Sequence, residues 1–195
     1  MENLKGSNYS WGLVAKIFHW TLAVFILSQI SFGINLHFMD PSRIKGELIH
    51  FHKIFGTFIL FLIFLRLAWK FYNPSPSHEG LSFFHKISSK IIQMLMYIFL
   101  ILIPIQGMLL TWVSGSDVLL LGIIKLPRLI EEDFILHSQY MDVHYAMTIT
   151  LFTLFLIHLS ASMLHIFYFK AVSYTHLRAH ETREDRGWRR VGGKK

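Results

Sequence analysis

The sequence predicts an all-α protein, a polytopic membrane four-helix bundle with both termini in the cytoplasm. Hydrophobic residues make up 53% of the 195-residue chain and the mean hydropathy is +0.44, which is too apolar for a soluble domain of this length. Four apolar runs are each long enough to cross about 30 Å of hydrocarbon. These predicted helices span residues 13–34, 49–71, 87–112 and 141–169.

Helix-breaking residues separate the four runs. The first connector contains Asp40-Pro41, and the second contains Pro74 and Pro76. The third connector, residues 113–140, is the longest and includes two glycines, a proline and an acidic cluster. We predict a short amphipathic helix on the surface there.

The distribution of Lys and Arg predicts the orientation, because cytoplasmic flanks carry an excess of both. The N-terminal flank, the second connector and the end of the fourth helix carry Lys5, Lys16, Arg66, Lys70, Lys86, Lys90 and Lys170. The other side carries Arg43, Lys45, Lys53, Lys125 and Arg128, diluted by seven carboxylates. Both termini are therefore placed in the cytoplasm.

The last residues do not resemble the rest of the chain. The segment VSYTHLRAHET, from Val172, resembles a translated library-preparation adapter, so residues 172–195 are interpreted as a non-native basic tail and residues 1–171 as one transmembrane domain. The alternative is a genuine basic tail that lies on anionic lipid. Without this segment the net charge falls from +7 to +3, so no nucleic-acid partner is predicted.

The chain contains no cysteine. This excludes disulfides, thiolate zinc sites, iron–sulfur clusters held by cysteine, and covalent c-type haem. Any haem must be held by histidine or methionine.

Four histidines, His19, His52, His144 and His158, lie near the ends of the apolar segments, where an ionisable group is costly and usually functional. His144 and His158 are fourteen residues apart in one run, so they return to nearly the same helix face about 21 Å apart along its axis. With the predicted topology, His19 and His158 lie in the inner half and His52 and His144 near the outer boundary. Two bis-histidine haems, held by the pairs His19/His158 and His52/His144, fit this arrangement. His165, one heptad beyond His158, is an alternative partner for His19, and depth alone does not decide between them.

Several neighbouring residues have more than one interpretation. Gly56, four residues after His52, either lets a flat macrocycle approach the helix or packs one helix against another. Arg66 and Lys70 are expected to reach the inner lipid headgroups. Lys53, Arg43 and Lys45 lie on the outer side near the proposed haem, where cations neutralise propionates or attract a small anion, although Arg43 and Lys45 are preferably interpreted as loop charges that face water. The remaining histidines before the tail are interpreted as solvated: His37, His50, His78, His85 and His137.

Motifs in five parts of the chain resemble those of the bacterial cytochrome b561 family, which includes the b-type subunits of nickel–iron hydrogenases. They are IFHW around His19, HKIFG around His52, PIQG at 104–107, LGIIKLP at 121–127, and the spacing from His144 to His158 followed by His165. The resemblance implies a four-helix diheme electron carrier of the bacterial inner membrane. It implies His19, His52, His144 and His158 as ligands of two haem b groups, and it favours His158 over His165.

The leading functional hypothesis is therefore membrane electron transfer between a donor, such as superoxide, and the quinone pool. The expected cofactors are two haem b groups and ubiquinone, and the expected partners are lipid and quinone. Such a protein is either an oxidoreductase of the superoxide:ubiquinone type or an electron carrier. One alternative is a relay subunit for a partner dehydrogenase or hydrogenase. An alternative from another class is a histidine-lined transition-metal transporter, although the helix interiors contain almost none of the carboxylates or polar breaks that transporters use.

Overall fold

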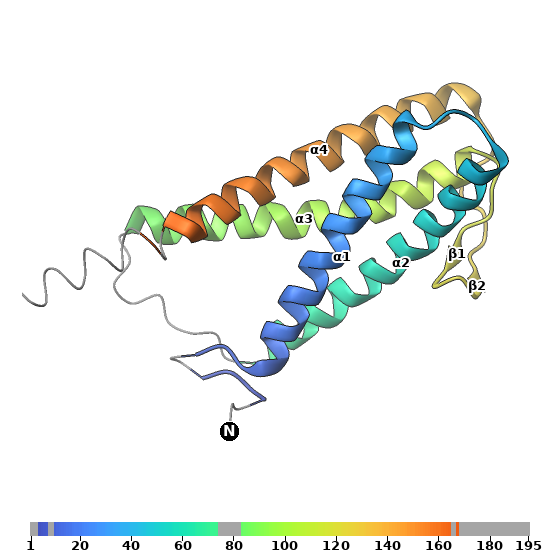
Figure 1. Ribbon diagram of the computed structural model, residues 1–195. Helices are drawn as coiled ribbons and strands as arrows, with labels where there is room; N and C mark the ends of the chain where they lie inside the picture. Colours follow the sequence, from blue (N-terminus) through green and yellow to red (C-terminus); the bar gives the residue numbers. More distant parts are fainter. Residues whose placement is uncertain (1–3, 8–9, 74–82, 165–166, 168–195) are drawn as a thin grey trace, which may run out of the picture. The chain divides into compact units, whose positions relative to one another are not determined.

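The computed structural model describes residues 4–7, 10–73, 83–164 and 167, and it consists mainly of helices (Figure 1). The elements are α1 (Leu13–Phe38), α2 (Arg43–Tyr72), α3 (Phe83–Val113), β1 (Leu119–Leu120), β2 (Ile124–Lys125) and α4 (Phe134–Leu164). All four helices are long and apolar enough to cross a membrane, which confirms the predicted fold class. The cytoplasmic placement of the termini stays a prediction. The predicted tail at 172–195 and His165 lie outside the described residues.

The described residues form two compact units, one that ends at Leu154 and one that begins at Phe155. α4 runs through this boundary, so its first two thirds belong to the first unit. The cavity and the contacts described below lie within the first unit.

Three of the four helices, α2, α3 and α4, begin earlier than the apolar runs predict. α2 begins at Arg43, where the side chain of Ser42 accepts a hydrogen bond from the backbone N–H of Lys45 at 3.1 Å. α4 begins at Phe134, where Oδ1 of Asp133 accepts from the N–H groups of Ile135 and Leu136. Such caps satisfy backbone donors of the first helical turn. The apolar runs gave only part of each helix. In the same way, α3 begins at residue 83, four residues before its predicted start, and α1 ends at residue 38, four residues after its predicted end.

α1 and α2 pack side by side in antiparallel directions (Figure 1). Between them lies a core of Leu22, Ile59 and Ile63, which are at most 4% exposed, with Phe25 and Phe55 packed against it. This core lies between the positions of His19 and His52 on the two helices. It fixes the register in which the two helices bring further side chains together.

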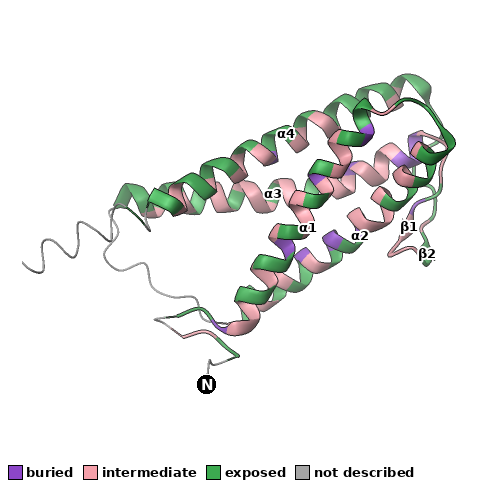
Figure 2. Ribbon diagram, in the orientation of Figure 1, coloured by how far each residue is buried: buried purple, intermediate pink, exposed green. Residues whose placement is uncertain are grey.

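Many large apolar residues are exposed, and exposed positions run along all four helices (Figure 2). Phe51, Phe58, Phe61 and Phe64 of α2 are 36–57% exposed, although all are large and apolar. Contiguous apolar surface of this kind is rare on soluble monomers and is expected where lipid covers the helices.

The connector between α3 and α4 is a short hairpin, so the predicted amphipathic surface helix is wrong. β1 and β2 pair in antiparallel directions, and the turn between them requires positive φ angles at Leu121 (54°) and Gly122 (77°). Thr57 of α2 accepts a hydrogen bond from the Leu121 N–H at 3.0 Å, and a Cβ at Gly122 would lie 3.2 Å from Ile54. These contacts hold the hairpin against α2. The left-handed conformation of its turn excludes a helix at this position.

A charged contact closes the base of the hairpin. Lys125 and Asp117 form an ion pair at 2.6 Å, and the hydrogen bond from Lys125 holds the pKa of the Asp117 carboxyl below its usual range. Both side chains are largely exposed, so the pair contributes little to stability. It keeps Asp117 ionised at the rim of the neighbouring cavity.

Candidate cofactor site

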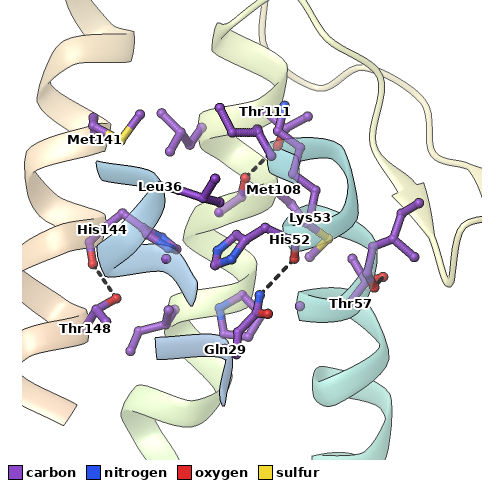
Figure 3. Close-up of a pocket in the computed structure, with 18 of the residues that line it drawn as sticks. Gln29, Leu36, His52, Lys53, Thr57, Met108, Thr111, Met141, His144 and Thr148 are labelled. Carbon is purple, nitrogen blue, oxygen red and sulfur yellow. Dashed lines mark hydrogen bonds between the residues drawn. The ribbon is translucent and has the colours of Figure 1, made fainter. Parts of the chain in front are cut away.

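A cavity of about 670 Å³ lies in the first unit, lined by residues of all four helices and of the hairpin (Figure 3). Its volume is within the usual range for small-molecule and cofactor sites. Aliphatic side chains form most of the wall. The polar residues that line it include the predicted ligands His52 and His144. Three further histidines, His37, His50 and His137, also line it.

The imidazoles of His52, from α2, and His144, from α4, face one another across this cavity (Figure 3). Their ring centres are 6.4 Å apart and the ring planes are inclined by 76°. This separation is too long for a direct hydrogen bond between the rings. Two metal–imidazole bonds of about 2 Å each, with the distance from each nitrogen to its ring centre, account for a gap of this size.

Gln106 of α3 fixes the protonation pattern of His144. The Gln106 amide nitrogen donates to the backbone carbonyl of Tyr140 at 2.6 Å, so its oxygen is oriented toward Nδ1 of His144, 2.7 Å away. A carbonyl oxygen only accepts, which requires the proton of the neutral ring on Nδ1. The Nε2 lone pair is then free for coordination, and the outer hydrogen bond orients the ring as is usual for metal-bound histidines.

Two glycines make room for the imidazole rings. A Cβ at Gly33 of α1 would lie 3.0 Å from Cε1 of His52, and a Cβ at Gly107 of α3 would lie 3.3 Å from Cε1 of His144. A larger side chain at either position would push the ring from its place. Gly56, singled out from the sequence, also lines the cavity, and a Cβ there would be in ordinary contact with Gln29.

His52 is held from its backbone. The Gln29 amide nitrogen of α1 donates to the His52 carbonyl at 2.8 Å. In the described part of the chain, Nδ1 of His52 and the Gln29 side-chain oxygen are buried without a hydrogen-bond partner. An unsatisfied buried imidazole nitrogen is costly, and coordination of a metal would offset this cost.

The number of ligands discriminates between metals. Over the residues that the structure describes, no group of three or more His, Cys, Asp or Glu side chains gathers to hold a metal ion. Two imidazoles are too few for a tetrahedral zinc site. They are sufficient for haem, because the macrocycle supplies the other iron ligands, and the residues present therefore fit this group.

His19 lies about 21 Å from the level of Gly33 and His52, measured along the α1–α2 pair. Nδ1 of His19 lies 3.1 Å from a guanidinium nitrogen of Arg66 in α2. His19 is fourteen residues before Gly33, and Arg66 is fourteen after His52, so the two contacts belong to one antiparallel register. The interpretation of Arg66 as a residue that reaches toward the headgroups is thus wrong, because its side chain turns inward to His19.

The second ligand at the level of His19 was predicted to be His158. His158 lies in α4 within the second unit, so the pairing of His19 with His158 stays a prediction. His78 falls outside the described ranges. His37 and His50 are exposed at the rim of the cavity, where the His37 ring stacks on Tyr145 with ring centres 4.7 Å apart, and His85 is exposed near the start of α3.

The cations near the cavity differ in their partners. Arg43 forms an exposed ion pair with Glu47, and the Lys45 ammonium donates to the Met39 carbonyl. Lys53 is half-buried in the cavity wall, and no acceptor contacts its ammonium among the described residues. Of the three cations, Lys53 is therefore the most available for an anion.

The fold and the cavity together define a class of protein, membrane helix bundles that present two opposed histidines inside an apolar core. The family model for prokaryotic cytochrome b561 matches residues 10–173, a range that contains all four helices. The chain belongs to the prokaryotic cytochrome b561 family, as its motifs predicted. It is accordingly a multi-pass bacterial membrane protein that binds b-type haem and transfers electrons. A comparison with curated proteins found no match.

Sequence reasoning missed Gln29, Gly33 and Gln106 as parts of the site. Gln29 and Gln106 lie in the middle of apolar segments, where a polar amide is unfavourable unless it is paired. That contrast was a usable signal. The role of Gly33 had no comparable signal, because it depends on which helix lies opposite His52.

Replacement of Gln106 tests the hydrogen bond to His144. Gln106→Leu leaves the Nδ1–H without its acceptor and should raise the midpoint potential of one haem, because the ligand donates less charge to ferric iron. Gln106→Glu provides a stronger acceptor and should lower it. Haem affinity should fall by about 10–100-fold in the leucine variant. Spectroelectrochemical titration measures both effects, and a shift in the same direction for both variants would contradict this role.

Proposed function

We propose that this protein is a diheme carrier that passes electrons from an anionic donor outside the membrane to the quinone pool. His52 and His144 hold one haem b, and His19 and His158 hold the other. Haem iron supplies a reversible one-electron change at each site. The observation that carries the proposal is the opposed pair of imidazoles, 6.4 Å apart, in a cofactor-sized apolar cavity.

The chain prepares each site in a different manner. At the His52–His144 site, Gln106 sets the tautomer of one ligand and Gly33 makes room for the other. At the His19 level, an arginine of the neighbouring helix lies beside the histidine, so the charge near the two sites differs. Different surroundings give different affinities and potentials, as a directional carrier needs.

The position of Lys53 supports an anionic donor. It lies in the wall of the cavity next to His52, on the side that the distribution of Lys and Arg predicts to be outside. A local positive charge raises the frequency of productive encounters with an anion such as superoxide. Superoxide that gives up one electron leaves as dioxygen, and a quinone that takes up a pair of electrons and a pair of protons becomes a quinol.

Stopped-flow mixing of superoxide with the purified, oxidised protein tests this function. Haem reduction should be observed, and it should slow as the Debye length falls from about 30 Å at 0.01 M salt to about 10 Å at 0.1 M. Lys53→Glu should slow it further at low salt, with both haem spectra unchanged. Lys90→Glu, a charge reversal at an exposed position near the start of α3, serves as the control.

Two results would contradict the anionic donor. One is the absence of any reduction by superoxide, and the other is a rate that neither salt nor Lys53→Glu changes. A relay subunit that receives electrons from a docked dehydrogenase or hydrogenase then becomes the preferred function.

A further inference from the structure

Two cations lie together in the α2 span at the level of His19. The Arg66 guanidinium is 5.8 Å from the centre of the Tyr97 ring, and the Lys70 ammonium is 4.8 Å from the same centre. Arg66 is half-buried, and Lys70 follows it by one helical turn. A charged group at the depth of Arg66 in a membrane segment is rare and usually functional, whereas Lys70 is exposed in the last turn of α2.

No described carboxylate neutralises these cations. The carboxylates in the described part of the chain are at positions 40, 47, 117, 131–133 and 142, all near the opposite ends of the helices. The face of Tyr97 offsets part of the charge through cation–π contact. Two cations on one helix turn still repel each other, and the repulsion grows as the surroundings become less polar. The cluster is therefore suited to an anion.

The hydrogen bond between Arg66 and His19 adds a second constraint. A guanidinium has no acceptor, so Arg66 donates and Nδ1 of His19 accepts. The neutral ring then carries its proton on Nε2, and its one lone pair is already used. Iron at Nδ1 would displace Arg66, whereas iron at Nε2 would move the proton to Nδ1, where two donors would face each other. Coordination by His19 and this hydrogen bond therefore exclude one another.

We propose that Arg66 and Lys70 form a carboxylate-binding site for the propionate groups of the haem held by His19, and that Arg66 exchanges between His19 and this carboxylate. The inference rests on the proposed haem at His19. Arg66 is suited to both positions, because its planar fork binds a carboxylate through two parallel hydrogen bonds. Tyr97 lies beside both cations, so the two charges are already close together.

The test compares protohaem with its dimethyl ester, in which both propionates are uncharged. The full-length chain carries His144→Ala so that only the His19 site takes up haem, and binding is followed by the Soret absorbance. Protohaem should bind about ten- to a hundredfold more tightly than the ester, the usual effect of hydrogen bonds to a charged group. Arg66→Gln should reduce this preference at least about tenfold, Lys70→Gln should reduce it less, and Arg66→Lys should restore part of it.

A matched control and a second readout separate this role from a structural one. Lys90→Gln removes an exposed cation near the start of α3 and should keep the full preference for protohaem. Arg66→Gln should also lower the midpoint potential of the bound haem, because an uncompensated propionate stabilises ferric iron. A preference that is unchanged in both Arg66→Gln and Lys70→Gln, or an equal loss of affinity for acid and ester, would overturn the proposal. If the His144→Ala chain binds no haem of either kind, the proposed haem at His19 fails instead.

Discussion

Replacement of His144 by alanine is expected to reduce the haem content from two groups per chain to one. The substitution removes one of the two imidazoles that face each other across the cavity, and the remaining His52 alone does not hold the group. His52→Ala should lose the same haem. His19→Ala and His158→Ala should each lose the other, and the haems left behind in the two sets of variants should differ in midpoint potential.

The pyridine haemochrome assay and a redox titration measure this outcome. His37→Ala is a suitable control, since this exposed residue stacks on Tyr145 at the rim and should leave both haems in place. If His144→Ala and His158→Ala retained a haem with the same potential, the pairing of the four histidines would be wrong. A wild-type chain with a single haem would contradict the diheme assignment altogether.

Substitution of Gly33 by valine is expected to abolish haem binding between His52 and His144 although neither ligand is changed. A Cβ at Gly33 would already lie 3.0 Å from the His52 ring, and the methyl groups of valine would push the imidazole out of line. Gly107→Val should have the same effect through His144, where the corresponding distance is 3.3 Å. The haem at His19 should remain.

Gly46→Val provides the matched control, because a Cβ at this exposed position of α2 has no neighbour within 4 Å. The helix propensity of valine is no lower than that of glycine. A loss of haem in any of the three variants is therefore not an effect of helix propensity. The absorbance spectra of the three variants measure the result. Retention of two unperturbed haems in Gly33→Val would show that His52 does not need its observed position.

Hydropathy was sufficient to predict the four helices. The approach of His52 to His144 was predicted from the depths of the two residues in helices of alternating direction. It was less informative about the surroundings of the histidines. Arg66 was expected near lipid headgroups but lies beside His19. This contact depends on the α1–α2 register, which follows from the packing of Leu22, Ile59 and Ile63 and has no pattern in the sequence. The hairpin at Leu121 was missed because β1 and β2 have two residues each, and strands so short have no detectable alternation.

The fourteen-residue interval between the two levels limits how this protein can evolve. On α1 it separates His19 from Gly33, and on α2 it separates His52 from Arg66. A single inserted residue within either interval would rotate everything beyond it by about 100° and bring one level out of alignment. Insertions and deletions among natural relatives should therefore be confined to the connectors and helix ends, while the lipid-facing positions between the levels exchange freely among apolar residues. A comparison of homologous genes would reveal this as a stretch of constant length with variable sequence.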